Sequence, residues 1–218
     1  SPFMNQNKTG LLGGTFNPVH RGHIELGLKI KAAFGLERIL YILSAQPPHK
    51  KRQALPPAEL RLAMLQAALL PHPGLLPCDL ELRRRGDSWT IDTILELKAA
   101  QPGERFYFIA GSEGFLKIRT WKEYRRILQE VYFIIVLRQG GHRQKVERLL
   151  REEGIPCLRE NEDPGLPPAA FLHTYVSDYL ELSATAIRKK MSRGQDISPY
   201  VERNVQKIME EIKLYEEG

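Results

Sequence analysis

Continuous apolar runs alternate along this chain with segments whose apolar residues recur at helical spacing. The clearest runs lie at 38–43, 106–110 and 131–137, and they are apolar at nearly every position instead of every second one. A strand of that kind is buried on both faces, as in a parallel sheet covered by helices on either side. The alternation therefore predicts an α/β fold with a doubly wound parallel sheet.

The remaining elements follow from the same periodicities. Further strands are predicted at 9–14 and 171–176, and helices near 22–34, 58–69, 91–95, 144–153, 184–193 and 201–215. Asp87 or Ser88 is the expected cap of the third helix. A length of 218 residues suits a single domain. We interpret residues 1–8 as a remnant of an expression tag and a disordered start.

Composition narrows the class of protein. The formal charge of +6 gathers at 49–52, 83–85 and 188–190, without aromatic neighbours. Solvated basic faces explain these clusters, and a site for a small phosphate ester explains the sign as well as a nucleic acid would. Cys78 and Cys157 show no pairing pattern and are expected to be reduced packing residues. No apolar run is long enough for a bilayer, and we expect a cytoplasmic protein.

One segment carries most of the chemical information. Residues 13–23 read Gly-Gly-Thr-Phe-Asn-Pro-Val-His-Arg-Gly-His and directly follow the first predicted strand. Gly13 and Gly14 allow the backbone to approach a bulky anion closely. His20 and His23 stand three apart where a helix should begin, so both rings should project from one side of its first turn. A helix start also attracts phosphate, and the segment predicts a polyphosphate cradle.

Other interpretations of this segment are weaker. The Gly-x-x-x-x-Gly-Lys-Ser/Thr loop of ATPases and the Gly-x-Gly-x-x-Gly fingerprint are both absent. His-x-x-His could ligate a metal, but no Glu lies between the two histidines and no Cys-x-x-Cys occurs. A glycine-rich turn with two incidental surface histidines remains the alternative.

A second candidate anion site lies at 182–188, Leu-Ser-Ala-Thr-Ala-Ile-Arg. Ser183 is a good helix cap, and Thr185 falls in the first turn. Arg188 follows one turn later and can reach back with a planar, permanently charged guanidinium. An ordinary capped helix with a surface arginine explains these residues equally well.

Together these motifs make the chain resemble the bacterial-type nicotinate-nucleotide adenylyltransferases of the nucleotidyltransferase superfamily. The family pattern Gly-Gly-Thr/Ser-Phe-Asn-Pro-x-His-x-Gly-His is matched throughout 13–23, and Ile-Ser-Ser-Thr-x-Ile-Arg is matched at 182–188 apart from Leu182 and Ala184. Between them, Pro-Pro-His-Lys matches at 47–50. Ser-Tyr-Thr-x-Asp-Thr matches at 88–93, with Trp89 in place of Tyr. The family's Gly-Ala/Thr-Asp appears as Gly111-Ser112-Glu113, and its Trp as Trp121.

The resemblance implies a Rossmann-like fold and a set of roles. His20, His23 and Arg188 would act on the ATP phosphates, with Lys50 near the phosphates or the mononucleotide. The nucleotide would also be met by Gly13, Gly14, Thr15, Phe16, Gly111, Glu113, Ser183 and Thr185. The mononucleotide would be met by Asn17, Thr90, Trp121 and Arg138.

The implied reaction transfers AMP from ATP to nicotinate mononucleotide and releases pyrophosphate, in NAD biosynthesis. Mg²⁺ would arrive with the ATP phosphates, and the other partners would be small molecules rather than nucleic acid or membrane. A homo-oligomer is left open. One alternative is a superfamily transferase acting on phosphopantetheine or glycerol phosphate. The other is an RNA-binding or tRNA-charging protein, because His20-Arg21-Gly22-His23 resembles a signature of class I tRNA synthetases.

Overall fold

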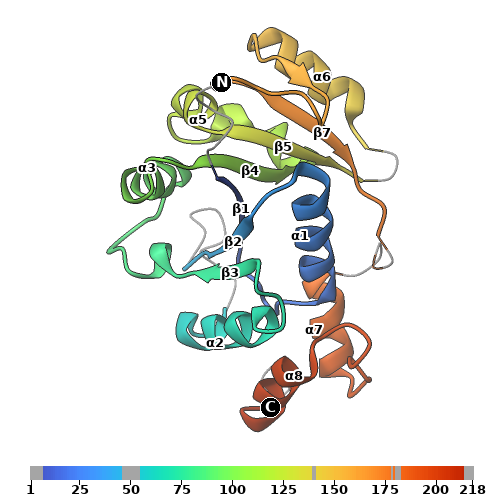
Figure 1. Cartoon of the computed structure of the whole chain (residues 1–218). Helices are drawn as coiled ribbons and strands as arrows, with labels where there is room; N and C mark the ends of the chain where they lie inside the picture. Colours follow the sequence, from blue (N-terminus) through green and yellow to red (C-terminus); the bar gives the residue numbers. More distant parts are fainter. Residues whose placement is uncertain (1–6, 46–54, 139–140, 178, 180–182, 214–218) are drawn as a thin grey trace.

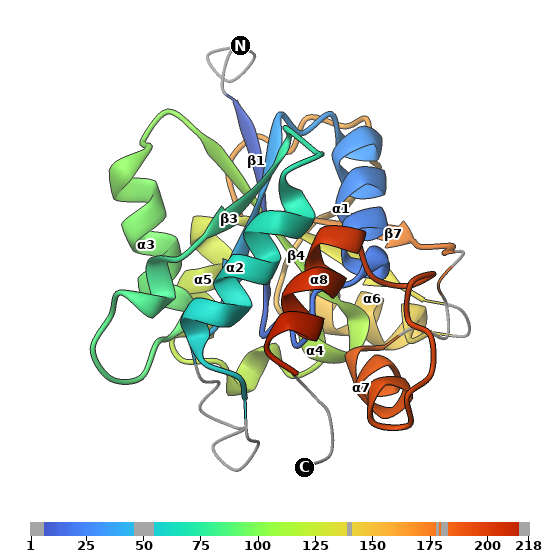
Figure 2. The same cartoon turned by 90° about the horizontal axis from the view of Figure 1, so that it is seen from below.

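The computed structural model describes residues 7–45, 55–138, 141–177, 179 and 183–213. A central sheet with helices on both faces makes up this structure, which Figures 1 and 2 show in two orientations. Within the described ranges, no helix is long and apolar enough to cross a membrane.

The sheet has seven strands in the order β3-β2-β1-β4-β5-β7-β6, and every neighbouring pair is parallel. The predicted doubly wound parallel sheet is therefore confirmed. The strands are β1 (Lys8–Gly14), β2 (Arg38–Leu43), β3 (Leu75–Cys78), β4 (Arg105–Gly111), β5 (Tyr132–Leu137), β6 (Cys157–Leu158) and β7 (Ala170–Thr174). The two edge strands, β3 and β6, are too short for their periodicity to have been recognised in the sequence.

Helices cover both faces of the sheet, as the continuous apolar strands predict. Alternate residues of β5 enter opposite cores: Ile134 packs on one face and Ile135 on the other. One core is closed by α1 (Arg21–Phe34), α2 (Ala58–Leu69), α7 (Ala184–Ser192) and α8 (Arg203–Glu211). The other is closed by α3 (Thr90–Ala100), α4 (Ser112–Phe115), α5 (Tyr124–Glu130) and α6 (Arg143–Glu152). Two 3₁₀ turns, η1 (Leu80–Leu82) and η2 (Ile118–Thr120), complete the elements.

Five details differ from the sequence prediction. The N-cap of α3 is Trp89 and not Asp87 or Ser88, because the side chain of Ser88 binds elsewhere. Lys8, assigned above to the start, is the first residue of β1 and pairs with Arg105. Cys157 is exposed rather than packed, because it lies on the edge strand β6. Strand β7 ends at Thr174 and α8 ends at Glu211, earlier than expected.

Strand order fixes where a ligand can enter. From β1 the chain builds outward through β2 to β3, and it then returns to place β4 against the other side of β1. The connections after β1 and after β4 therefore leave in opposite directions, which opens a crevice at their carboxyl ends. The segment 13–23 begins at this edge, because Gly13 and Gly14 end β1.

Candidate active site

A cavity of about 650 Å³ lies at this edge of the sheet. Its wall includes the ends of β1 and β4, and side chains from α1, α3 and α7. Most of the residues predicted for the site line it: Gly13, Gly14, Thr15, Phe16, Asn17, His23, Thr90, Gly111, Trp121 and Arg138. The tertiary structure thus gathers residues from far-apart segments around one space.

The other predicted site residues that the structure describes do not line the cavity. His20, Ser183, Thr185 and Arg188 are not among the residues that line it, although His20 contacts His23 and Arg188 contacts Asn17, which both do. Glu113 is 88% exposed, and its carboxylate lies 4.0 Å from His142 Nε2 instead of facing the cavity. Lys50 lies outside the described residues.

The turn that leaves β1 is compact. Phe16 takes a left-handed backbone conformation, with φ +45°, and its ring returns to the core, where it is almost fully buried. A Cβ on Gly14 would lie 3.3 Å from Cζ of that ring, which is tighter than an ordinary contact. The glycine therefore lets the chain turn over Phe16 and expose its backbone to the cavity.

The two histidines form a reciprocal cap at the start of α1. Nδ1 of His20 accepts the Gly22 N–H at 3.1 Å, and Nδ1 of His23 accepts the His20 N–H at 3.1 Å. The two rings lie side by side, with centroids 3.7 Å apart, which confirms the predicted common side. Since each Nδ1 accepts a backbone hydrogen bond, each neutral ring carries its proton on Nε2.

Burial keeps both rings uncharged. Desolvation, and then the Arg138 charge, lower the pKa of His20 to about 4. The pKa of His23 is lowered well below its usual value by burial first, and then by His20 and Arg138. At neutral pH the pair therefore offers two neutral N–H donors, and the positive charge comes from arginine.

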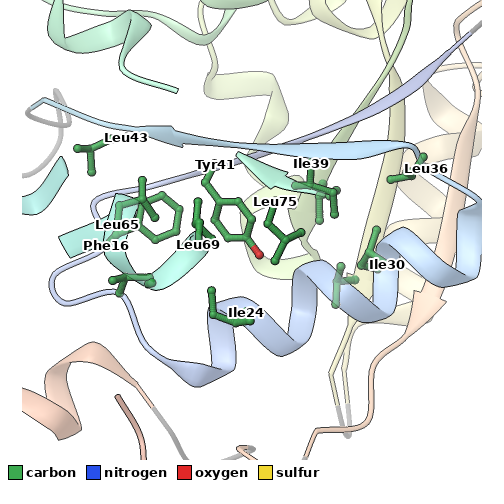
Figure 3. Close-up of a cluster of buried hydrophobic side chains, with 14 of the residues drawn as sticks. Phe16, Ile24, Ile30, Leu36, Ile39, Tyr41, Leu43, Leu65, Leu69 and Leu75 are labelled. Carbon is green, nitrogen blue, oxygen red and sulfur yellow. The ribbon is translucent and has the colours of Figure 1, made fainter. Parts of the chain in front are cut away.

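Two glycines of α1 hold this arrangement in place. A Cβ on Gly22 would lie 2.9 Å from Cε1 and Nδ1 of the His20 ring. One turn later, the Tyr41 hydroxyl donates to the His23 carbonyl at 2.8 Å, and a Cβ on Gly27 would lie 2.0 Å from that hydroxyl. Figure 3 shows the Tyr41 hydroxyl pointing at α1 from the buried cluster on β2. Burial raises the pKa of Tyr41, which remains a donor.

The second predicted segment meets the first through Arg188. Its Nη1 donates to the Asn17 carbonyl at 2.5 Å, across 171 residues of sequence, and its Nη2 donates to Thr185 Oγ1 at 3.1 Å. Ser183 caps α7 as predicted, because its Oγ accepts the Ala186 N–H at 3.0 Å. Arg188 therefore joins α7 to the turn that follows β1.

Aromatic side chains also line the cavity. The Trp121 ring packs edge-on against Phe108, with centroids 5.7 Å apart. Trp89 also lines the cavity and lies under the Lys122 ammonium, 5.4 Å from the ring centroid. Thr90 opens α3, and no side chain caps that helix. A helix start and a flat aromatic wall therefore face the same space.

The sequence analysis did not identify Arg61 as a residue that supports the site. It is 1% exposed and donates to four backbone carbonyls, those of Thr15, Ser44, Ala45 and Pro56. It thereby ties the β1 turn to the segment that leaves β2. The sequence feature that could have indicated its role is its position, because Arg61 is a charged residue beside the apolar stripe of α2. Within the described ranges, no three His, Cys, Asp or Glu side chains are grouped so that they could hold a metal ion.

Comparison with known proteins agrees with this geometry. Residues 11–190 match the family described as Cytidylyltransferase-like. A probable nicotinate-nucleotide adenylyltransferase of Geobacter metallireducens is 33% identical, over 95% of this chain and 98% of that protein. Another, from Desulfatibacillum aliphaticivorans, is 35% identical over 95% and 99%. This chain belongs to the nicotinate-nucleotide adenylyltransferase family.

Solved structures agree on the fold. The Plasmodium falciparum nicotinic acid mononucleotide adenylyltransferase complexed with NaAD superposes with a TM-score of 0.74 at 19% identity. That match covers 96% of this chain and 97% of the other. The implied Rossmann-like α/β architecture is therefore confirmed.

Proposed function

We propose that this protein transfers AMP from ATP to nicotinate mononucleotide, yielding nicotinate adenine dinucleotide and pyrophosphate for NAD biosynthesis. The observation that carries the proposal is the meeting of the two motifs: Arg188 on α7 binds the turn that precedes the paired histidines. The two motifs meet at the switch point of the parallel sheet. Relatives of this chain are named as probable nicotinate-nucleotide adenylyltransferases, which supports the same reaction.

The chemistry asks little of the protein beyond positioning and charge. A phosphate oxygen of the mononucleotide attacks the α-phosphorus of ATP, and the bond to the β-phosphate oxygen breaks. The nucleophile is already an anion, so no proton has to be removed. The Nε2–H groups of His20 and His23 would donate to phosphate oxygens, and Arg188 would balance the growing charge on pyrophosphate. Mg²⁺ would enter with the ATP phosphates as part of the substrate.

The aromatic part of the cavity wall suits the pyridine ring. Trp121 would stack on that ring, while Thr90 and the open start of α3 would meet the carboxylate. The N–H groups of an uncapped helix start favour an anion. Arg138 and Asn17 also line the cavity and would contact the mononucleotide.

The proposed binding of the adenosine part of ATP is supported by fewer contacts. Gly13, Gly14, Thr15 and Phe16 would cradle the nucleotide, with Ser183 and Thr185 assisting from α7. Gly111 lines the cavity and would face the ribose. Glu113 would have to swing away from His142 to join it. Lys50 is proposed to act near the phosphates. We also propose that the enzyme is cytoplasmic and that its substrates are small molecules.

Release of pyrophosphate from ATP tests the proposal directly. The purified protein is given ATP with nicotinate mononucleotide, nicotinamide mononucleotide, phosphopantetheine or glycerol phosphate. A hydrogen bond to a charged group contributes about 1.5–3 kcal/mol, so kcat/KM should favour nicotinate over nicotinamide by about 10- to 150-fold. Turnover with phosphopantetheine or glycerol phosphate alone, or binding of bulk tRNA without turnover, would refute it.

A further inference from the structure

One arginine of the triplet 83–85 behaves differently from its neighbours. The Arg83 side chain is 67% exposed and pairs with Asp79, whereas the Arg84 side chain is 19% exposed. Arg84 Nη1 donates to Ser88 Oγ and to Thr93 Oγ1, both at 2.7 Å, and Nη2 donates to Glu96 at 2.6 Å. The sequence interpretation of a solvated basic cluster is therefore wrong for Arg84.

The two hydroxyls held by Arg84 flank the start of α3. Ser88 precedes the N-cap Trp89, and Thr93 lies one turn into the helix. Both residues line the cavity, together with Trp89 and Thr90 between them. A single guanidinium nitrogen thus joins the two ends of the segment proposed to meet the pyridine carboxylate.

A carboxylate lies on the same stretch of wall. Glu81 lines the cavity, and its Oε2 accepts the Thr93 hydroxyl at 2.8 Å. Among the described residues that line the cavity, it is the acidic one. Desolvation raises the pKa of Glu81, while the Thr93 hydrogen bond and the Arg84 charge oppose that shift. Arg84 therefore places a compensating positive charge beside the acidic side chain of this wall.

We infer that Arg84 is a positioning residue that sets the preference for nicotinate over nicotinamide mononucleotide. Its guanidinium acts in two ways from the same position. Its bonds to Ser88 and Thr93 hold the first turn of α3 open toward the cavity, and its charge offsets Glu81. Without Arg84, the positive charge that favours the pyridine carboxylate is lost, while Glu81 still offers an acceptor to the amide N–H₂ of the competing substrate.

The inference rests on the proposed function and is tested on the same enzyme. The variants are Arg84→Met, Glu81→Gln, the double variant, and Arg83→Met as the matched control from the exposed face. We expect Arg84→Met to lower the kcat/KM ratio of nicotinate to nicotinamide mononucleotide by about tenfold, since a charged hydrogen-bond network is lost. Glu81→Gln should raise the ratio or leave it unchanged, the double variant should recover part of the loss, and Arg83→Met should match the wild type.

The outcomes distinguish a specificity role of Arg84 from a purely structural role, and they distinguish failure of this inference from failure of the proposed function. An equal loss for both substrates in Arg84→Met means that the residue only supports the fold, and overturns the inference. If Arg84→Met does not fold, Glu81→Gln decides alone: a ratio shifted toward the amide overturns the inference. A wild-type enzyme that uses neither mononucleotide overturns the proposed function instead.

Discussion

Gly22→Ala is the sharpest test of how the histidine pair is held. The new Cβ would lie 2.9 Å from two atoms of the His20 ring, closer than real Cβ contacts come. The ring cannot simply rotate away, because Nδ1 accepts the Gly22 N–H and the His23 ring lies 3.7 Å from it. We therefore expect the His20 ring to shift by several tenths of an ångström, with its Nε2–H leaving its position.

The expected effects on stability and on activity have different sizes. Losing the bond from Gly22 N–H to His20 costs about 0.5–1.5 kcal/mol. Replacing glycine by alanine in a helix gains up to about 1 kcal/mol. The free energy of unfolding should therefore fall by no more than about 1.5 kcal/mol. A catalytic donor displaced by a fraction of an ångström should lower kcat by about 10- to 100-fold.

The assay measures pyrophosphate release at saturating substrates and urea unfolding of the same preparations. Gly103→Ala is the matched control, because a Cβ there meets nothing within 4 Å and the residue lies far from the cavity. A Gly22→Ala enzyme with wild-type kcat would show that the His20 ring need not be held against the backbone. A variant destabilised by several kcal/mol would show that the contact mainly supports the fold.

Two further predictions concern charge. His20 has a folded-state pKa of about 4 against an ordinary 6.5, so the unfolded chain binds the extra proton as the pH falls through this window. The free energy of unfolding should drop by up to about 1.4 kcal/mol per pH unit below pH 6.5 for this group. His20→Asn, which keeps a good cap, should lose that part of the slope in urea titrations at pH 7.5, 6 and 5; an unchanged slope would contradict the burial argument. Arg188→Lys keeps the charge but cannot bind Asn17 and Thr185 while reaching a phosphate, so kcat/KM for ATP should fall at least about tenfold. Wild-type kinetics in that variant would mean that Arg188 only joins α7 to the β1 turn.

Local sequence predicted most of the scaffold, because the features that form a strand or a helix are contained within it. The run at 38–43 became β2 without a shift of either end, since every residue after Arg38 is apolar or aromatic and both faces needed cover. Ser183 capped α7 for an equally local reason: its hydroxyl reaches a backbone N–H three residues on. Short edge strands such as β3 escaped, because four residues do not establish a period.

What the sequence by itself determined is therefore the order of the five longer strands and of the longer helices, and the motif residues placed at their ends. Tertiary structure alone decided which side chain faces what. It brought Arg188 to Asn17, kept His20 and His23 neutral by burial, and buried Arg61 among backbone carbonyls. It also turned Arg84 inward while leaving Arg83 in solvent, although the two are adjacent and chemically identical. Burial and partner choice depend on residues distant in the chain, so no local pattern contains them.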